Sequence, residues 1–230
     1  TISGTLTTNV RGGNLLIAAL NIFTGTVINV SDTRGNTYVP IGTARYGNDR
    51  NYLYYVKDAL PGSTVVTFGL GGTDLRSLEL YEYSGVDWIA PLDQTSFGSA
   101  GTSTNCSPGN ITPSQNNSLI FSLGGDFVSG GTAAVTTAPG YTLRGSVYPT
   151  TNERFYTEEL IQTTAAQTNG SFTLANAANN RAIQAVFNPE PTRGTITLDA
   201  TGQHGTSSAV NGTLAHTVGN GDDRMLIVQV

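Results

Sequence analysis

The stretch that decides the fold is GTLTTNVRGGNLLIAAL at residues 4–20, because it returns near the end of the chain as GTLAHTVGNGDDRMLIVQV at residues 212–230. In both copies a Gly-Thr-Leu segment precedes a glycine-rich turn and an apolar run, Leu15–Leu20 in the first copy and Met225–Val228 in the second. The offset between the copies is 208 residues before the turn and 210 after it. A solenoid repeat has a period of only about 20–50 residues. The chain is therefore expected to hold one nearly complete module and the opening strands of another.

The rest of the chain follows the pattern of β-strands. The run Leu15–Leu20 has no polar face, so it is expected in the middle of a sheet that is covered on both sides. Elsewhere, short stretches of β-branched and aromatic residues recur between Gly, Asn, Asp or Pro. Strands are expected at residues 3–10, 14–21, 26–31, 36–42, 50–58, 63–69, 75–84, 118–123, 141–148, 153–163, 170–174 and 180–187. Without intervening helices, this predicts an all-β fold, an antiparallel two-sheet β-sandwich of jelly-roll type with a C-terminal β extension.

Composition divides the chain into three segments. Residues 1–188 are expected to form the β-sandwich module. Residues 189–194 are rich in proline and predict an extended, semi-rigid linker. Residues 195–230 are expected to be the start of a second copy or a strand-donating tail. Within the module, the Ser/Thr/Gly/Pro/Asn-rich segment 93–118 is predicted to cross from one sheet to the other.

Charge and composition exclude several classes of function. The formal net charge is −5, with 11 basic residues against 16 acidic ones, and Lys57 is the only lysine. Nucleic-acid binding is not expected, because phosphate contacts need clustered Lys and Arg. No apolar run approaches the roughly 18 residues of a membrane-spanning helix. The single cysteine, Cys106, cannot form an internal disulfide.

Four motifs occur in a fixed order. They are D-x-x-G-N-x-Y at residues 32–38, the pair Tyr54-Tyr55, EYSGVD at residues 82–87 and Gly140-Tyr141-Thr142. In this order they resemble a β-sandwich repeat module of secreted and surface-exposed prokaryotic proteins, often found in tandem. The resemblance covers roughly residues 1–188. It implies an extracellular or cell-surface location and a structural or adhesive role, and it offers no active-site residues.

No residue pattern indicates an enzyme. Both histidines, His204 and His216, lie in the tail, so neither a zinc site nor a Ser-His-Asp or Cys-His arrangement is expected in the module. The carboxylates that glycoside hydrolysis would need are Glu79, Glu82, Glu158 and Glu159. Adjacent strand residues face opposite sides, and so do residues three apart, so these pairs are not expected to share a site. We expect the four to be solvated on strand faces.

No cofactor is expected, with calcium as the one candidate for which the sequence offers ligands. Asp32, Asp49 and Asp126 fall in predicted loops or at strand ends, where carboxylate oxygens could converge on the ion. For Asp32 there is a second and favoured interpretation. In this interpretation the carboxylate accepts backbone N–H groups within a hairpin turn.

The leading hypothesis is a non-enzymatic building block of an extracellular fibre, sheath or surface array, whose partners are copies of itself. The tail has a predicted strand at 195–200 before its Gly-Thr-Leu segment, whereas no counterpart precedes Thr1. The module is therefore expected to present an open sheet edge that a strand of another copy can fill. Tandem linkage of modules predicts the same sequence. The expected assembly residues are Thr195, Ile196, Thr197, Leu198, Leu214, Leu226, Ile227 and Val228.

The alternative is a carbohydrate-binding or adhesive surface module, because exposed aromatic side chains can stack on sugar rings. The candidate glycan-contacting residues are Trp88, Tyr46, Tyr52 and Tyr141. Trp88 has a second interpretation, in which its indole plugs the end of the sandwich.

Overall fold

The computed structural model describes residues 1–72, 76–127, 134–147 and 153–191. Thr1–Glu190 form one compact unit, and a second unit begins at Pro191. In the described residues every regular element is a strand, and no helix there is available to cross a membrane. The strands are β1 (Ile2–Thr5), β2 (Leu15–Ile22), β3 (Thr26–Asp32), β4 (Val39–Tyr46), β5 (Asp49–Val56), β6 (Val65–Gly71), β7 (Arg76–Tyr83), β8 (Leu92–Cys106), β9 (Ser118–Phe127), β10 (Val135–Thr136), β11 (Thr142–Val147), β12 (Glu153–Gln162) and β13 (Phe172–Phe187).

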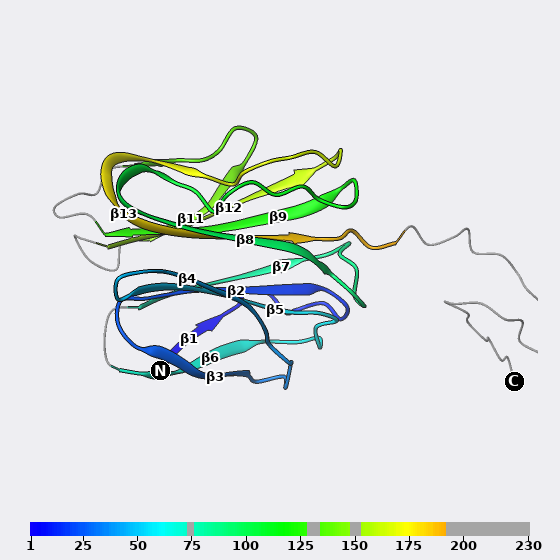
Figure 1. The fold of residues 1–230 in the computed structure, drawn as a ribbon. Coiled ribbons are helices and arrows are strands. Elements are labelled where there is room, and N and C mark those ends of the chain that lie inside the picture. Colours follow the sequence, from blue (N-terminus) through cyan, green and yellow to red (C-terminus); the bar gives the residue numbers. More distant parts are fainter. Residues whose placement is uncertain (73–75, 128–133, 148–152, 192–230) are drawn as a thin grey trace, which may run out of the picture. The chain divides into compact units, whose positions relative to one another are not determined.

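The strands form three antiparallel sheets that lie as layers (Figure 1). The small sheet has the order β1-β6-β3, and the middle sheet has the order β4-β5-β2-β7. The large sheet has the order β10-β13-β9-β12-β11, with β8 also paired to β13. The middle sheet lies between the other two, so both of its faces are covered.

Strand β2 shows why the apolar run had to lie in the middle layer. It pairs with β5 on one side and β7 on the other, and all eight of its residues are buried. Ile17 and Ala19 pack toward the large sheet, whereas Ala18 and Leu20 pack toward the small sheet. The prediction that this run is covered on both sides is confirmed. Burial of each large aliphatic side chain contributes about 1.5–3 kcal/mol.

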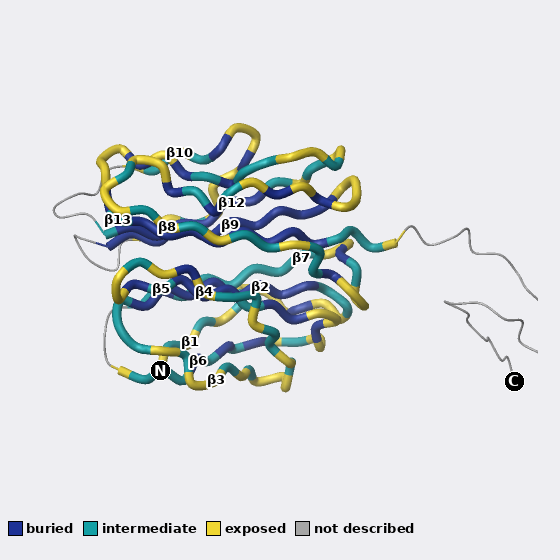
Figure 2. Tube along the Cα trace, in the orientation of Figure 1, coloured by how far each residue is buried: buried dark blue, intermediate teal, exposed yellow. Residues whose placement is uncertain are grey.

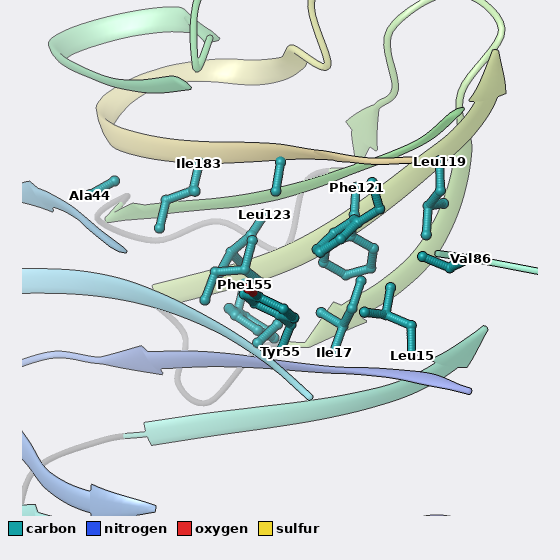
Figure 3. Packing of buried hydrophobic residues seen from close by; sticks show 14 residues of the cluster. Leu15, Ile17, Ala44, Tyr55, Val86, Leu119, Phe121, Leu123, Phe155 and Ile183 are labelled. Carbon is teal, nitrogen blue, oxygen red and sulfur yellow. The ribbon is translucent and has the colours of Figure 1, made fainter. Parts of the chain in front are cut away.

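The core between the middle and large sheets combines aliphatic side chains with aromatic rings (Figure 3). The ring of Tyr55 meets that of Phe187 edge-on, with their centroids 5.7 Å apart. The rings of Tyr81 and Phe121 have their centroids 5.1 Å apart. Figure 3 shows Ile17 of β2 directed into the same core. Contacts of this kind hold the two sheets together through residues that are far apart in sequence.

The two longest strands of the large sheet, β8 and β13, pair with each other, and both bend (Figure 1). Strand β13 pairs with β10 near its start and with β9 over its second half. Its register with β8 shifts between Thr173 and Ala178. As a result Phe172 packs against Tyr156 on the outer face, with ring centroids 4.5 Å apart. Figure 2 shows that burial is concentrated in the central strands, β2 and β5 of the middle sheet and β9 and β12 of the large sheet.

The prediction that residues 93–118 cross from one sheet to the other was wrong, because β8 and β9 both belong to the large sheet. Leu92–Cys106 form the 15-residue strand β8. Because its Ser, Thr and Gly residues alternate between half-buried and exposed positions, the segment lacks an apolar signal, and it is held by pairing with the distant strand β13. For the same reason the strands expected at 170–174 and 180–187 are one strand, β13.

The prediction of an all-β antiparallel sandwich is confirmed, and a third sheet accompanies the two that were expected. The start of the predicted linker belongs to the body. Pro189 forms a β-bridge with Val86, and the N–H of Glu190 donates to the carbonyl of Gly85 at 2.8 Å. The predicted C-terminal extension and all eight assembly residues lie beyond Pro191, outside the described residues.

Candidate functional site

The turn between β3 and β4 is organised by Asp32, the first residue of the D-x-x-G-N-x-Y motif. Its Oδ1 accepts the backbone N–H groups of Arg34, Gly35 and Asn36 at 2.8–3.1 Å. Its Oδ2 accepts hydrogen bonds from Asn36 Nδ2 at 2.8 Å and from the Tyr38 hydroxyl at 3.0 Å. Burial acts to raise the pKa of Asp32, but these hydrogen bonds outweigh it and lower the pKa. Asp32 therefore accepts the backbone N–H groups of the turn, as the favoured interpretation expected. The expectation of a hairpin was wrong, because β3 belongs to the small sheet and β4 to the middle sheet, so the turn connects two sheets.

The same motif attaches this turn to the loop after β5, which is in turn bonded to the loop after β7. Asn36 Oδ1 accepts the N–H of Leu60 at 2.8 Å, in the loop after β5. In that loop Asp58 has φ 51°, a left-handed conformation that Asp adopts more readily than most residues. Lys57 Nζ donates to the carbonyl of Ile89 at 2.7 Å, in the loop after β7. Three loops that are distant in sequence are thereby joined.

These loops enclose an open groove of about 450 Å³, here called the Trp88 groove. Its large apolar side chains are Leu60, Trp88 and Ile89, which are 47%, 39% and 59% exposed. Asp87 stabilises the turn that carries Trp88, because its Oδ1 accepts the N–H groups of Ile89 and of the next residue at 2.8 and 3.1 Å. Val86, not Trp88, packs into the neighbouring core. Trp88 therefore lines a surface groove and does not plug the sandwich.

Polar groups line the same groove. Thr37, Lys57 and Asp58 are all exposed there. Lys57 uses one of its three ammonium hydrogens on the Ile89 carbonyl. Within the described residues, no hydrogen bond engages the carboxylate of Asp58 or the hydroxyl of Thr37. A donor and an acceptor with spare capacity thus lie beside an aromatic ring.

The four aromatic residues proposed as glycan contacts do not form one surface. Tyr52 is 9% exposed and packs between the small and middle sheets. Tyr141 is 7% exposed, its hydroxyl is hydrogen-bonded to that of Thr168, and burial raises its pKa to about 12. Tyr46 is half-buried beside Gly101. Of the four, only Trp88 lines the groove.

Asp49 and Asp126, the other calcium candidates, lie in a buried ionic cluster. Arg181 has no solvent exposure, and its guanidinium nitrogens lie 3.3 Å from Asp49 Oδ2 and 3.7 Å from Glu153 Oε1. Arg154 Nε donates to Asp126 Oδ1 at 2.9 Å. Burial raises the pKa of Glu153 to about 7, against the opposing effect of Arg181. Two guanidinium groups thus supply the positive charge, and the described part of the chain holds no cluster of His, Cys, Asp or Glu suited to a metal ion.

Two of the glutamates considered for hydrolysis lie at the seam between β7 and β12. Glu79 Oε2 accepts hydrogen bonds from the hydroxyls of Tyr81 at 2.6 Å and Thr157 at 2.9 Å, and burial raises its pKa. Glu159 is 8% exposed and pairs with Arg144. The expectation that these carboxylates are solvated was wrong, because hydroxyl and guanidinium donors replace the water.

Glu158 and Glu82 lie apart from that seam. Glu158 has no solvent exposure and accepts the N–H of Ala138 at 3.1 Å, on the face of β12 opposite Glu159. Burial raises the pKa of Glu158 to about 8. Glu82 accepts hydrogen bonds from the backbone of Arg11 and the side chain of Asn14. Glu79 and Glu159 therefore share one seam, whereas Glu82 and Glu158 lie elsewhere.

Cys106 is not placed to act as a nucleophile. It is fully buried, its Sγ donates to the carbonyl of Arg181 at 3.4 Å, and burial raises its pKa to about 11. A thiol in this environment remains protonated at neutral pH. His204 and His216 lie outside the described residues.

Strand β1 is an edge of the small sheet. It pairs with β6 over Ile2–Thr5, and among the described strands none pairs with its other side. This edge carries unpaired backbone groups that can add a further strand.

Sequence reasoning named Trp88 but missed the other walls of its groove. Lys57, Asp58, Leu60 and Ile89 lie in different loops, and no local pattern links them. The nearest signal was the Leu60-Pro61-Gly62 turn, which marks a loop without showing what it faces.

Comparisons with protein-family models, with curated proteins and with solved structures find no match to this chain.

Proposed function

We propose that this chain is a non-enzymatic structural building block of an extracellular fibre, sheath or surface array, joined to neighbouring copies by strand pairing through its C-terminal segment. The observation that carries the proposal is the repeat of residues 4–20 at 212–230. In the body, residues 4–20 include the end of the edge strand β1 and most of the fully buried strand β2.

The repeated apolar run in the tail favours burial against another β-sheet. In β2 the corresponding residues are buried on both faces of the middle sheet. A second run of this kind, at Met225–Val228, would expose four large apolar side chains if it were left in water. Burying each stabilises the assembly by about 1.5–3 kcal/mol, so a second sandwich is the favoured setting for this segment.

The free side of β1 offers a place for the first tail strand. Thr195–Ala200 alternate polar and apolar residues, as a strand with one buried face does. Each backbone hydrogen bond formed with β1 contributes about 0.5–1.5 kcal/mol net. The second and third tail strands would compete with β1 and β2 of the neighbour, so we assign donation to Thr195–Ala200 alone.

The test compares the full chain with a chain that ends at Pro191. The cut is placed after Pro191 because the N–H of Glu190 is bonded to the carbonyl of Gly85, so a cut before Glu190 would damage the body. We expect the full chain to form end-to-end assemblies by light scattering and negative-stain electron microscopy. The shortened chain should remain folded by circular dichroism but monomeric.

Point variants separate strand pairing from other effects of the tail. Thr197→Pro removes a backbone donor from the middle of the predicted donor strand and should abolish assembly. Gln203→Pro, in the predicted loop that follows, is the matched control and should assemble normally. Assemblies that persist without residues 192–230, or a full chain that stays monomeric at high concentration, would contradict the proposal.

A further inference from the structure

We propose that the Trp88 groove binds a neutral sugar residue of a surface or matrix glycan, with the indole stacked on the sugar ring and with Lys57 and Asp58 hydrogen-bonded to its hydroxyls. This goes beyond the structural function proposed above and does not depend on it. The groove belongs to the body and is complete within the described residues.

Exposed apolar side chains usually occur singly on a protein surface, but three of them occur together in this groove. Leu60, Trp88 and Ile89 line one groove and are each at least 39% exposed. Other exposed apolar residues, such as Ile28 and Ile161, lie on separate strands. Contiguous exposed apolar surface marks an interaction site more often than scattered residues do. The volume of about 450 Å³ lies within the range of about 300–1,000 Å³ typical of ligand sites.

The polar groups of the groove select the chemistry of the ligand. Lys57 can donate further hydrogen bonds and the Asp58 carboxylate can accept them. A sugar hydroxyl both donates and accepts, so neighbouring hydroxyls can satisfy both residues. The opposite charges of the pair balance, so the groove has no preference for an acidic or a basic ligand. An apolar protein surface docked here would desolvate both charges without replacing their hydrogen bonds, which is costly.

The groove is held in shape before any ligand arrives. The Asp32 carboxylate holds the first loop, Asn36 bonds to Leu60 in the second, and Lys57 bonds to Ile89 in the third. Sites whose side chains are already positioned lose less conformational entropy on binding. This arrangement suits a stacking platform for a rigid ring.

Trp88 is the only tryptophan in the chain, so intrinsic tryptophan fluorescence reports directly on the groove. The full chain would be titrated with neutral oligosaccharides of β-linked glucose, β-linked N-acetylglucosamine and α-linked mannose, and with an acidic oligogalacturonate. We expect a saturable change of intensity or emission maximum with at least one neutral series, with a Kd of about 1 mM or lower. The acidic series should bind about tenfold more weakly or not at all. A flat response to all three neutral series up to about 50 mM would overturn the proposal.

Variants assign the binding to the named side chains. By titration calorimetry, Trp88→Ala should weaken sugar binding about tenfold or more, and Lys57→Gln and Asp58→Asn each about threefold or more. Ile161→Ala, at an exposed apolar residue outside the groove, is the control and should bind normally. Circular dichroism checks folding, and if Trp88→Ala unfolds, the two exposed charged positions decide the outcome. Unchanged affinity in those two variants would overturn the assignment, whatever the assembly experiment shows.

Discussion

At the scale of single residues, the large sheet depends on charged groups that have been removed from water. Arg181 and Glu153 have no solvent exposure, and each lies beside an opposite charge. Removing one member of such a buried pair leaves an uncompensated charge, which typically destabilises a protein by about 3–5 kcal/mol. The cluster therefore constrains where β13 and β12 can lie relative to each other.

Glu158 is expected to make the stability of the body depend on pH. Burial raises its pKa from the ordinary 4.5 to about 8. Between these values the folded state binds more protons than the unfolded state, so stability falls as pH rises from about 4.5 to 8. Glu153, with a pKa of about 7, acts in the same direction. Glu158→Gln keeps an acceptor for the Ala138 N–H but cannot ionise.

Urea denaturation of the wild type and of Glu158→Gln at pH 4 and pH 8.5 tests this. The loss of stability between the two pH values should be smaller in the variant by about 1 kcal/mol or more. At pH 4 the carboxyl is mostly protonated in both states, so the two proteins should differ little there, which serves as the internal control. Equal pH dependence in the two proteins would show that Glu158 does not carry the effect.

At the scale of elements, strand patterns and turn chemistry behave differently. A run such as Leu15–Leu20 can be predicted as a buried strand from the sequence, because every position in it is apolar. Strand β8 cannot be predicted in this way, because its Ser- and Thr-rich sequence has no apolar pattern. It is a strand because it pairs with the distant strand β13. The turn after β3 depends on one carboxylate that accepts five hydrogen bonds.

Asp32→Ala should destabilise the body by about 2–4 kcal/mol, because hydrogen bonds to a charged acceptor contribute about 1.5–3 kcal/mol each and water replaces them only in part. Asp32→Asn keeps an Oδ1 acceptor for the backbone and should lose about half as much. Ser31→Ala, at the exposed preceding residue, is the control and should stay within about 0.5 kcal/mol of the wild type. Chemical denaturation measures all three. Equal stability of Asp32→Ala and Ser31→Ala would mean that the turn does not depend on this carboxylate.

At the scale of the whole body, the middle sheet contributes side chains to two cores, one with each of the other sheets. The three sheets should therefore unfold together. Leu20→Ala removes packing between the small and middle sheets and should cost about 2–5 kcal/mol. Phe121→Ala removes packing between the middle and large sheets and should cost about 3–5 kcal/mol. Each variant should shift one transition seen alike by far-UV and near-UV circular dichroism. Ile28→Ala, 70% exposed, is the control. A separate early transition in Leu20→Ala would show that the small sheet unfolds independently.

What the sequence determined by itself is the part of the molecule that depends on neighbours along the chain. The apolar run predicted a doubly covered strand, and Asp32 with Gly35 and Asn36 predicted a turn, because period and turn chemistry are local properties. The tertiary structure decided the rest. Lys57 meets Ile89, and Arg181 meets Asp49, across 32 and 132 residues of sequence. Only the packing of the sheets, through burial and hydrogen bonding between them, brings such residues together. It places polar residues that the sequence alone would assign to the surface in a groove or in a buried ion cluster.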